Sequence, residues 1–164
     1  MPKNIILKPP LVTVNKSVQF KNLPINYLKF CFLKISVRML QYIQKDSEAR
    51  TPVSILDKLD YYGWNIEWHM SLGDDKRKIV SEIISRKIGN SENSNLTLVE
   101  CGSYVGYSTV LFGSLMRKND RLISIESVPE FSEVTAKLCH LAGLKNIEFI
   151  PRTSQEAIKE SYKK

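Results

Sequence analysis

The chain has 164 residues, of which 43% are hydrophobic, 25% charged and 9% aromatic. This balance fits a soluble globular protein of one domain and excludes a disordered, fibrous or collagen-like chain. Its three cysteines, Cys31, Cys101 and Cys139, are an odd number without metal-ligand spacing. They therefore predict neither a disulfide framework nor a structural zinc site.

The net charge of +7 is concentrated in the first part of the chain. Residues 1–45 contain no acidic residue and eight basic ones, which are Lys3, Lys8, Lys16, Lys21, Lys29, Lys34, Arg38 and Lys45. The rest of the chain has 16 basic and 17 acidic residues and is close to neutral. The basicity therefore belongs to an N-terminal extension, and because no nucleic-acid-binding motif accompanies it, we predict no nucleic-acid partner.

Residues 27–43 form an apolar segment that carries three basic residues, Lys29, Lys34 and Arg38. These leave only residues 30–33 uninterrupted, far fewer than the roughly 20 apolar residues that cross a bilayer, so we predict no transmembrane helix. Such a segment can lie on an anionic membrane surface, but we favour the alternative of a helix packed on its own domain. Since no secretory cleavage site follows, we expect a cytoplasmic protein, with membrane association through this segment as the alternative.

Two helices are predicted between residues 51 and 89. Thr51 and Pro52 form an N-cap and first-turn pair, and apolar residues then recur on one helical face up to Gly63. A second helix begins near Asp74, whose carboxylate favours a helix start, and ends at Gly89. Its apolar stripe consists of Ile79, Val80, Ile83, Ile84 and Ile88.

The remaining chain alternates between strand and helix patterns. Apolar runs predict strands at residues 96–100, 122–126 and 147–150, with helices following residue 108 and spanning about residues 129–140. Apolar strands joined by helical crossovers indicate a parallel sheet covered on both faces. The predicted fold class is therefore α/β, with a doubly wound, mostly parallel sheet that binds its ligands at the carboxyl ends of the strands.

The most informative stretch is the turn after the first strand, VECGSYVGYS at residues 99–108. Gly102 and Gly106 have no Cβ, so the backbone there can approach a ligand and turn sharply into a helix. Glu126 follows 20 residues after Gly106 at the end of the next strand, where a carboxylate can accept hydrogen bonds from the hydroxyls of a ribose. The pattern indicates an adenosine-containing cofactor; a purely structural tight turn is the alternative.

The residue at the centre of the turn bears on which cofactor this is. The glycine spacing is G-x-x-x-G, whereas the dinucleotide fingerprint has a middle glycine that admits a pyrophosphate. Tyr104 holds that middle position, and Glu100 just before the turn suits a cationic amino-acid group. Together they favour S-adenosylmethionine, and they argue against the nucleotide-binding half of an oxidoreductase, which would bind NAD.

At these residues the sequence resembles the catechol O-methyltransferases of the cation-dependent O-methyltransferase group. The matching motifs are RML at 38–40, SILD at 54–57, EWHM at 67–70, GDDK at 73–76, ECGSYVGYS at 100–108 and SQ at 154–155. The resemblance covers most of the chain. It implies a Rossmann-like methyltransferase domain over residues 38–164, preceded by a basic extension of residues 1–37, with only the N-terminal, cofactor-binding half of the domain present.

The resemblance implies a set of residues for the methionine end of S-adenosylmethionine. Glu100 is expected to meet the amino group, and Ser108 the carboxylate. The backbone around Leu72, Gly102 and Tyr104 is expected to line the same end of the cofactor.

The adenosine end is expected to contact four other residues. Glu126 would hold the ribose, Ser127 would lie against the adenine, and Ser154 with Gln155 would contact the adenine edge. Ser127 departs from the family, which usually has a larger apolar residue there, so it offers the adenine less packing surface. For Ser154 the alternative is an ordinary helix start, because serine is a common N-cap.

The resemblance also implies a substrate pocket. Trp68 and Met70 are expected to contact a catechol and the transferred methyl group, with burial in the core as the alternative. Arg77 departs from the family, which commonly has glycine there, and this puts the local turn geometry in doubt. His69 and His140 have no carboxylate or cysteine partner at ligand spacing, so we predict structural roles for both.

The implied reaction is methyl transfer from S-adenosylmethionine to a catechol hydroxyl, with Mg²⁺ as a family cofactor. Lys164 falls just before the expected fourth strand, and the family's magnesium ligands and catalytic lysine lie beyond that point. We therefore predict no catalytic or metal-binding residue within this chain, and no activity of the chain alone. The alternative is a non-catalytic module that binds S-adenosylmethionine or pairs with a partner through an open sheet edge.

Overall fold

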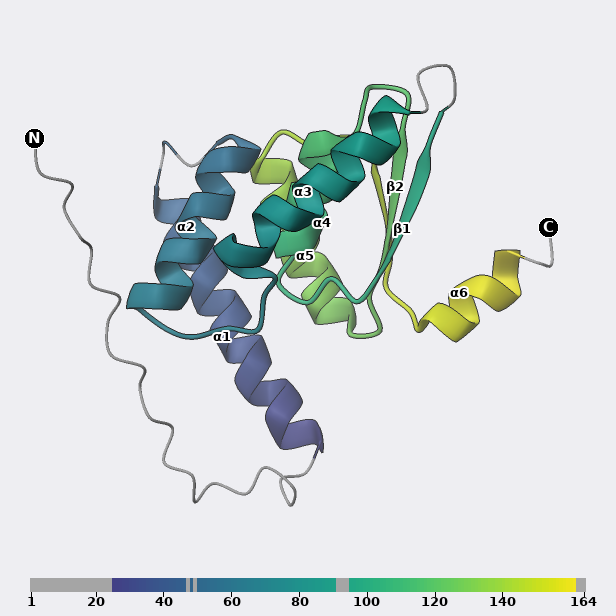
Figure 1. Cartoon of the computed structure of the whole chain (residues 1–164). Helices are drawn as coiled ribbons and strands as arrows, with labels where there is room; N and C mark the ends of the chain where they lie inside the picture. Colours follow the sequence, from purple (N-terminus) through teal and green to yellow (C-terminus); the bar gives the residue numbers. More distant parts are fainter. Residues whose placement is uncertain (1–24, 47, 49, 91–94, 162–164) are drawn as a thin grey trace, which may run out of the picture.

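The computed structural model describes residues 25–46, 48, 50–90 and 95–161 (Figure 1). Its helices are α1 (Ile25–Lys45), α2 (Pro52–Asn65), α3 (Gly73–Gly89), α4 (Tyr107–Leu115), α5 (Pro129–Leu141) and α6 (Ser154–Ser161). Its strands are β1 (Thr97–Cys101), β2 (Arg121–Ile125) and β3 (Ile147–Ile150). They form one sheet in the order β1-β2-β3 with both pairs parallel, which confirms the predicted α/β class.

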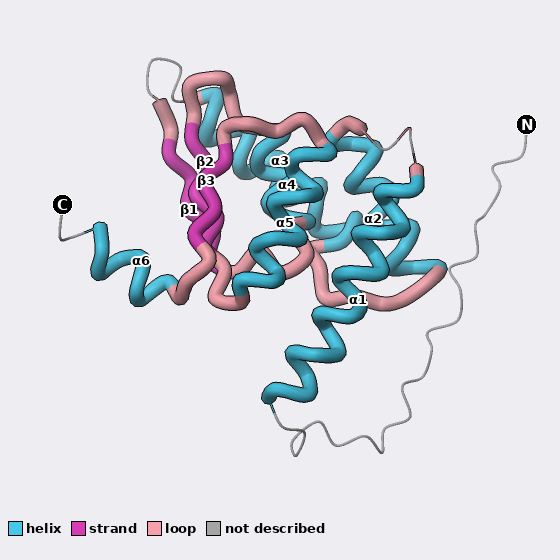
Figure 2. The backbone as a smooth tube through the Cα atoms, turned by 180° about the vertical axis from the view of Figure 1, so that it is seen from behind, coloured by secondary structure: helices cyan, strands magenta, loops and turns pink. Residues whose placement is uncertain are grey.

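The helices are distributed unequally over the sheet. Figures 1 and 2 show α1 to α5 on one side of the strands, with α6 lying apart beyond the other side. Among the described elements, the expected cover on both faces is therefore found on one face only. Val99 in the middle of β1 is 54% exposed.

Helix α1 packs on the rest of the domain. Met39 and Ile43 are completely buried, and the helix lies against α2 and α5. This confirms the favoured prediction of a packed helix, although Phe30 nearer its start is 53% exposed. None of the described helices has the length and apolar character to cross a membrane. The expected boundary between residues 37 and 38 falls inside α1 and stays a prediction.

Helix α2 begins with the predicted cap. The Thr51 hydroxyl accepts a hydrogen bond from the Ser54 backbone N–H at 3.1 Å, and the Ser54 hydroxyl accepts one from the Thr51 N–H at 3.0 Å. The helix continues through Gly63, where we expected it to end. A Cβ at Gly63 would lie 3.1 Å from Nε2 of His69, so this glycine makes room for a side chain rather than ending the helix.

We expect Thr51→Ala to lower the free energy of unfolding by about 1 kcal/mol, because the Ser54 backbone N–H loses its side-chain acceptor. Urea titration followed by circular dichroism measures the change. Ser85→Ala, at an exposed position in α3, is the matched control and should stay within about 0.5 kcal/mol of the parent. Equal losses in both variants would contradict a capping role for Thr51.

Helix α3 carries the predicted apolar stripe on a partly exposed face. Ile79 is 61% and Ile83 59% exposed, and no residue of α3 is buried. The stripe therefore predicted the helix correctly, but the described elements supply little cover for it.

The strand ends differ from prediction by one residue at β1 and β2, while β3 is as predicted. Glu100 is the last but one residue of β1, and Glu126 lies just beyond β2 instead of ending it. Cys101 pairs in register with Ile125, and Ile125 with Ile150. The carboxyl ends of the three strands are thus level, which places the residues that follow them at one edge of the sheet.

Candidate functional site

The predicted glycine turn connects β1 to α4 at this edge of the sheet. The Gly102 N–H donates to the Ile125 carbonyl at 2.7 Å, and the Gly106 N–H donates to the Ser103 carbonyl at 2.8 Å. Gly102, Tyr104 and Gly106 all have positive φ, at 89°, 47° and 82°. The turn is therefore left-handed at three positions, and one of them is a tyrosine that packing must hold in place.

The two glycines of the turn serve different purposes. A Cβ at Gly102 would meet no atom within 4 Å, so the backbone there is open to a ligand. A Cβ at Gly106 would lie 2.9 Å from Cγ2 and 3.1 Å from Cα of Thr135 in α5. Gly102 therefore faces open space, whereas Gly106 is required by the contact between the start of α4 and α5.

The Tyr104 side chain packs into the protein. Its ring makes edge contacts with Phe32 of α1 and Phe131 of α5, with centroids 5.7 and 4.9 Å apart. Its hydroxyl is buried and has no hydrogen-bond partner among the residues that the structure describes, and burial raises the pKa of the phenol. The backbone of Tyr104, rather than its ring, is then what the turn presents to a ligand. The steric objection to a pyrophosphate that we drew from this ring is therefore weakened, while the glycine spacing still differs from a dinucleotide site.

Glu100 is a buried carboxylate surrounded by hydroxyl groups. It is 7% exposed, and its Oε1 accepts a hydrogen bond from Ser108 at 2.5 Å. Its Oε2 accepts one from Thr109 at 2.5 Å and one from Ser124 at 2.9 Å. The structure thus brings the predicted pair of Glu100 and Ser108 together. Thr109 and Ser124 were missed, although a hydroxyl residue at a buried position of an apolar strand or helix is a usable signal.

Glu126 fastens the glycine turn to the end of β2. Its Oε2 accepts hydrogen bonds from the backbone N–H groups of Ser103 and Tyr104 at 3.0 and 2.9 Å. Its Oε1 accepts from the Val128 N–H at 2.9 Å and from the Ser127 hydroxyl at 3.3 Å. Glu126 is 6% exposed, so the carboxylate predicted to bind a ribose is also the acceptor that shapes the turn.

The predicted adenine contacts begin α6, which follows β3. Thr153 is the N-cap of this helix, because its N–H donates to Glu156 at 3.0 Å and its hydroxyl accepts from the Glu156 N–H at 3.3 Å. Ser154 is the first residue of α6, so its alternative of an ordinary helix start is confirmed, with Thr153 rather than Ser154 as the N-cap. Ser154 is half-buried and Gln155 is exposed, and both lie at the carboxyl end of the strand next to β2.

The segment between α2 and α3 carries the predicted substrate residues. Trp68 is 67% and Met70 58% exposed, so their alternative assignment to the core is wrong. Glu67 anchors the segment, because its carboxylate accepts hydrogen bonds from Arg38 of α1 and Tyr62 of α2, each at 3.0 Å. Leu72, at the end of the segment, packs partly buried against the core.

His69 lies buried between these two exposed side chains. Its Nε2 is 3.1 Å from the Leu59 carbonyl oxygen, and it is 5% exposed, as a structural histidine should be. His140 is exposed on α5. Among residues 25–46, 48, 50–90 and 95–161, no group of three or more His, Cys, Asp or Glu side chains could hold a metal ion.

Burial lowers the pKa of His69 below its ordinary value of 6.5. His69 therefore binds a proton more readily in the unfolded chain than in the folded chain. We expect the free energy of unfolding to fall as the pH drops from 7 to 5. Thermal unfolding across this range, in the parent and in His69→Gln, measures the effect. The slope should flatten in His69→Gln and persist in His140→Gln. An unchanged slope in His69→Gln would assign the pH dependence to other groups.

Comparison with known proteins gives relatives for most of the chain, although no protein-family model matches it. The chain is 30% identical over 128 residues to catechol O-methyltransferase of Bos taurus, covering 77% of this chain and 45% of the relative. It is 29% identical to a transmembrane O-methyltransferase of Propithecus coquereli, covering 77% of this chain and 44% of the relative. The chain thus spans about half the length of the curated relatives it matches.

A solved structure shares the fold. The O-methyltransferase TomG of Streptomyces achromogenes, involved in tomaymycin synthesis and solved in complex with S-adenosylmethionine, superposes with a TM-score of 0.53. The match covers 64% of this chain and 45% of that one at 17% sequence identity. The Rossmann-like methyltransferase fold expected from the sequence is thereby confirmed.

Proposed function

Because the chain is related in sequence to the catechol O-methyltransferases and has a methyltransferase fold, we propose that it supplies the S-adenosylmethionine-binding part of an O-methyltransferase acting on catechols. The observation that carries this proposal is the pair of buried carboxylates, Glu100 and Glu126, at the carboxyl ends of two neighbouring parallel strands. The open glycine turn lies between them in the chain, where ligands of such sheets bind.

The residues present fit the cofactor. Among the described residues, the hydroxyls of Ser108, Thr109 and Ser124 donate hydrogen bonds to Glu100, so its carboxylate could also meet the ammonium group of the cofactor. Gly102 leaves its backbone face free for close approach. Glu126 offers oxygens that can exchange the long contact to Ser127 for a ribose hydroxyl. We assign the remaining cofactor contacts to Leu72, Ser108, Ser154, Gln155 and the backbone of Tyr104.

Trp68 and Met70 are proposed to contact the acceptor. Two large apolar side chains exposed on one anchored segment are typical of a surface that binds a flat apolar molecule. The aromatic ring of a catechol could pack on Trp68, while Met70 lies on the side of the segment that leads to Leu72 and α3.

The proposed reaction depends mainly on how the protein orients the cofactor and the acceptor. When bound, S-adenosylmethionine supplies a methyl group on a positively charged sulfur. A deprotonated catechol oxygen would attack that carbon as the carbon–sulfur bond breaks and S-adenosylhomocysteine leaves, and most of the acceleration would come from holding the two reactants in line. The described residues offer no cluster for Mg²⁺, so we derive no step through a metal and assign no catalytic base. We propose that this chain alone binds the cofactor without turning it over.

Calorimetric titration with S-adenosylhomocysteine, the demethylated product, tests the proposal. We expect binding to the parent chain and an affinity at least tenfold lower in Glu126→Gln, which removes the charge that orients the ribose hydroxyls and replaces one oxygen that accepts from backbone N–H groups by an NH₂ group. NAD is the comparison ligand and should give no heat. Binding of NAD instead would favour the oxidoreductase alternative, and binding of neither would sink the cofactor-binding proposal. Cofactor binding without catechol methylation favours the non-catalytic module.

The cellular location also stays a proposal. We propose a cytoplasmic protein, with contact between residues 27–43 and an anionic membrane surface as the alternative. Co-sedimentation with phosphatidylserine vesicles separates the two. Retention on these vesicles, and not on neutral phosphatidylcholine vesicles, would support the membrane alternative.

A further inference from the structure

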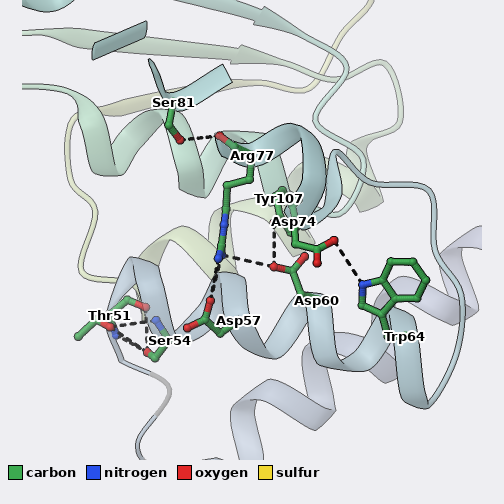
Figure 3. A network of polar contacts seen from close by, with 9 residues as sticks. All are labelled: Thr51, Ser54, Asp57, Asp60, Trp64, Asp74, Arg77, Ser81 and Tyr107. Carbon is green, nitrogen blue, oxygen red and sulfur yellow. Dashed lines mark hydrogen bonds and ion pairs between the residues drawn. The ribbon is translucent and has the colours of Figure 1, made fainter. Parts of the chain in front are cut away.

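Arg77, one of the two residues that depart from the family pattern, connects α3 to α2 (Figure 3). Its Nη1 and Nη2 both lie 3.0 Å from Oδ1 of Asp57, and Nη1 is also 3.4 Å from Oδ2 of Asp60. Its side chain is 25% exposed. The doubt about turn geometry at this position is resolved, because Arg77 lies inside helix α3 and its side chain crosses to the next helix.

Oδ2 of Asp60 also contacts a residue of a third helix, α4. The hydroxyl of Tyr107 donates a hydrogen bond to Oδ2 of Asp60 at 3.0 Å, and Figure 3 shows Asp60 lying between Arg77 and Tyr107. Tyr107 is 2% exposed, and the Asp60 side chain is 13% exposed. One carboxylate oxygen on α2 therefore contacts both α3 and α4.

The two ends of this chain of contacts lead to the two halves of the proposed site. Tyr107 is the first residue of α4, directly after Gly106 of the glycine turn. Arg77 lies one turn into α3, and α3 begins directly after the segment that ends at Leu72. A second tie holds the start of α3, since Nε1 of Trp64 donates to Asp74 at 3.4 Å.

The charges around Asp60 favour coupling between its contacts with Arg77 and Tyr107. Burial raises the pKa of Asp60, while Tyr107 and Arg77 stabilise its charged form. Asp74 and Asp57 also face it and act in the opposite direction. Without Arg77, Asp60 would keep the Tyr107 hydroxyl and two neighbouring carboxylates, so the charged form that accepts this hydrogen bond would be less stable.

We propose that Arg77 is a positioning residue that couples the segment carrying Trp68 and Met70 to the glycine turn, through Asp60 and Tyr107. The proposal deepens the proposed function, on which it rests for the identity of the two ligands. Cofactor bound at the turn would then be sensed by the segment that meets the acceptor, although Arg77 touches neither ligand.

Hydrogen exchange of the ligand-free chain tests the coupling. We expect Arg77→Gln and Tyr107→Phe each to speed amide exchange at least threefold in both residues 68–72 and 102–106. The double variant should exceed either single one only slightly, because both break the same connection. Amides of β2 should change less, which separates coupling from a general loss of stability. Arg86→Gln removes the same charge from an exposed position of α3 and is the matched control.

Two results would overturn the proposal. One is faster exchange around α3 in Arg77→Gln with an unchanged turn, and the other is additive effects in the double variant. Arg77→Lys, which keeps the charge, should restore part of the protection. Affinity for S-adenosylhomocysteine is a separate readout, and we expect a fivefold to tenfold loss in Arg77→Gln. If the parent binds no S-adenosylhomocysteine, the proposed function fails while the exchange data still decide the coupling.

Discussion

Glu100→Gln is expected to leave the chain folded while lowering its affinity for S-adenosylhomocysteine by about 10- to 100-fold. The amide oxygen can still accept from Ser108, and the hydroxyls of Thr109 and Ser124 can rotate to accept from the new NH₂ group. What disappears is the negative charge for the ligand's ammonium group. A hydrogen bond to a charged group contributes about 1.5–3 kcal/mol, which corresponds to this loss of affinity.

Glu100→Ala should behave differently and lower the free energy of unfolding by about 3–5 kcal/mol. It leaves a cavity and deprives three hydroxyl groups of their buried acceptor. Calorimetry and urea unfolding on both variants separate the two effects. Glu133→Gln, which removes an exposed charge on α5, is the control and should change neither quantity. Undiminished affinity in Glu100→Gln would remove Glu100 from the cofactor site.

The order of the elements was predictable because each depends on local patterns. The Thr51 cap and the unbroken apolar runs of the strands are read from neighbouring residues, and the structure has all of these elements. Strand ends were less predictable, since Cys101 belongs to β1 only through its pairing with Ile125 of β2. Glu126 was therefore predicted at the end of a strand but lies in the loop that follows β2.

The site was predictable where chemistry needs particular residue types and was missed where it depends on contacts across the chain. Glu100 and Glu126 stood out as carboxylates at strand ends. Ser124 is 24 residues from Glu100, and nothing in the sequence relates the two until the strands pair. Arg77 appeared only as a departure from glycine, because its partners lie on another helix.

The glycines show most clearly what the sequence cannot predict, because glycine is present for a different structural reason at each of three positions. Gly63 makes room for His69, Gly102 faces open space, and Gly106 lies against α5. From the sequence, Gly102 and Gly106 are equivalent members of one motif. The structure separates them, and the separation can be measured.

Gly106→Ala should lower the free energy of unfolding by about 3 kcal/mol. An alanine at φ 82° costs about 1–2 kcal/mol because its Cβ crowds the carbonyl oxygen. The new Cβ also meets Thr135 at 2.9 Å, and overpacking of this kind adds about 1–3 kcal/mol. Because the contact includes the Thr135 Cα, a change of side-chain rotamer alone cannot relieve it. Urea unfolding of the variant measures the loss.

Gly102→Ala is the matched comparison, because φ is 89° there and the Cβ meets nothing within 4 Å. It should cost only the backbone term, about 1–2 kcal/mol, yet weaken S-adenosylhomocysteine binding more than its stability loss explains. Thr135→Ser removes the methyl group that Gly106→Ala strikes, and keeps the hydroxyl that donates to the Tyr104 carbonyl. Combined with Gly106→Ala, it should recover part of the lost stability. If it recovers none, the Thr135 methyl group contributes nothing to the loss, which then comes from backbone strain and the contact with the Thr135 Cα.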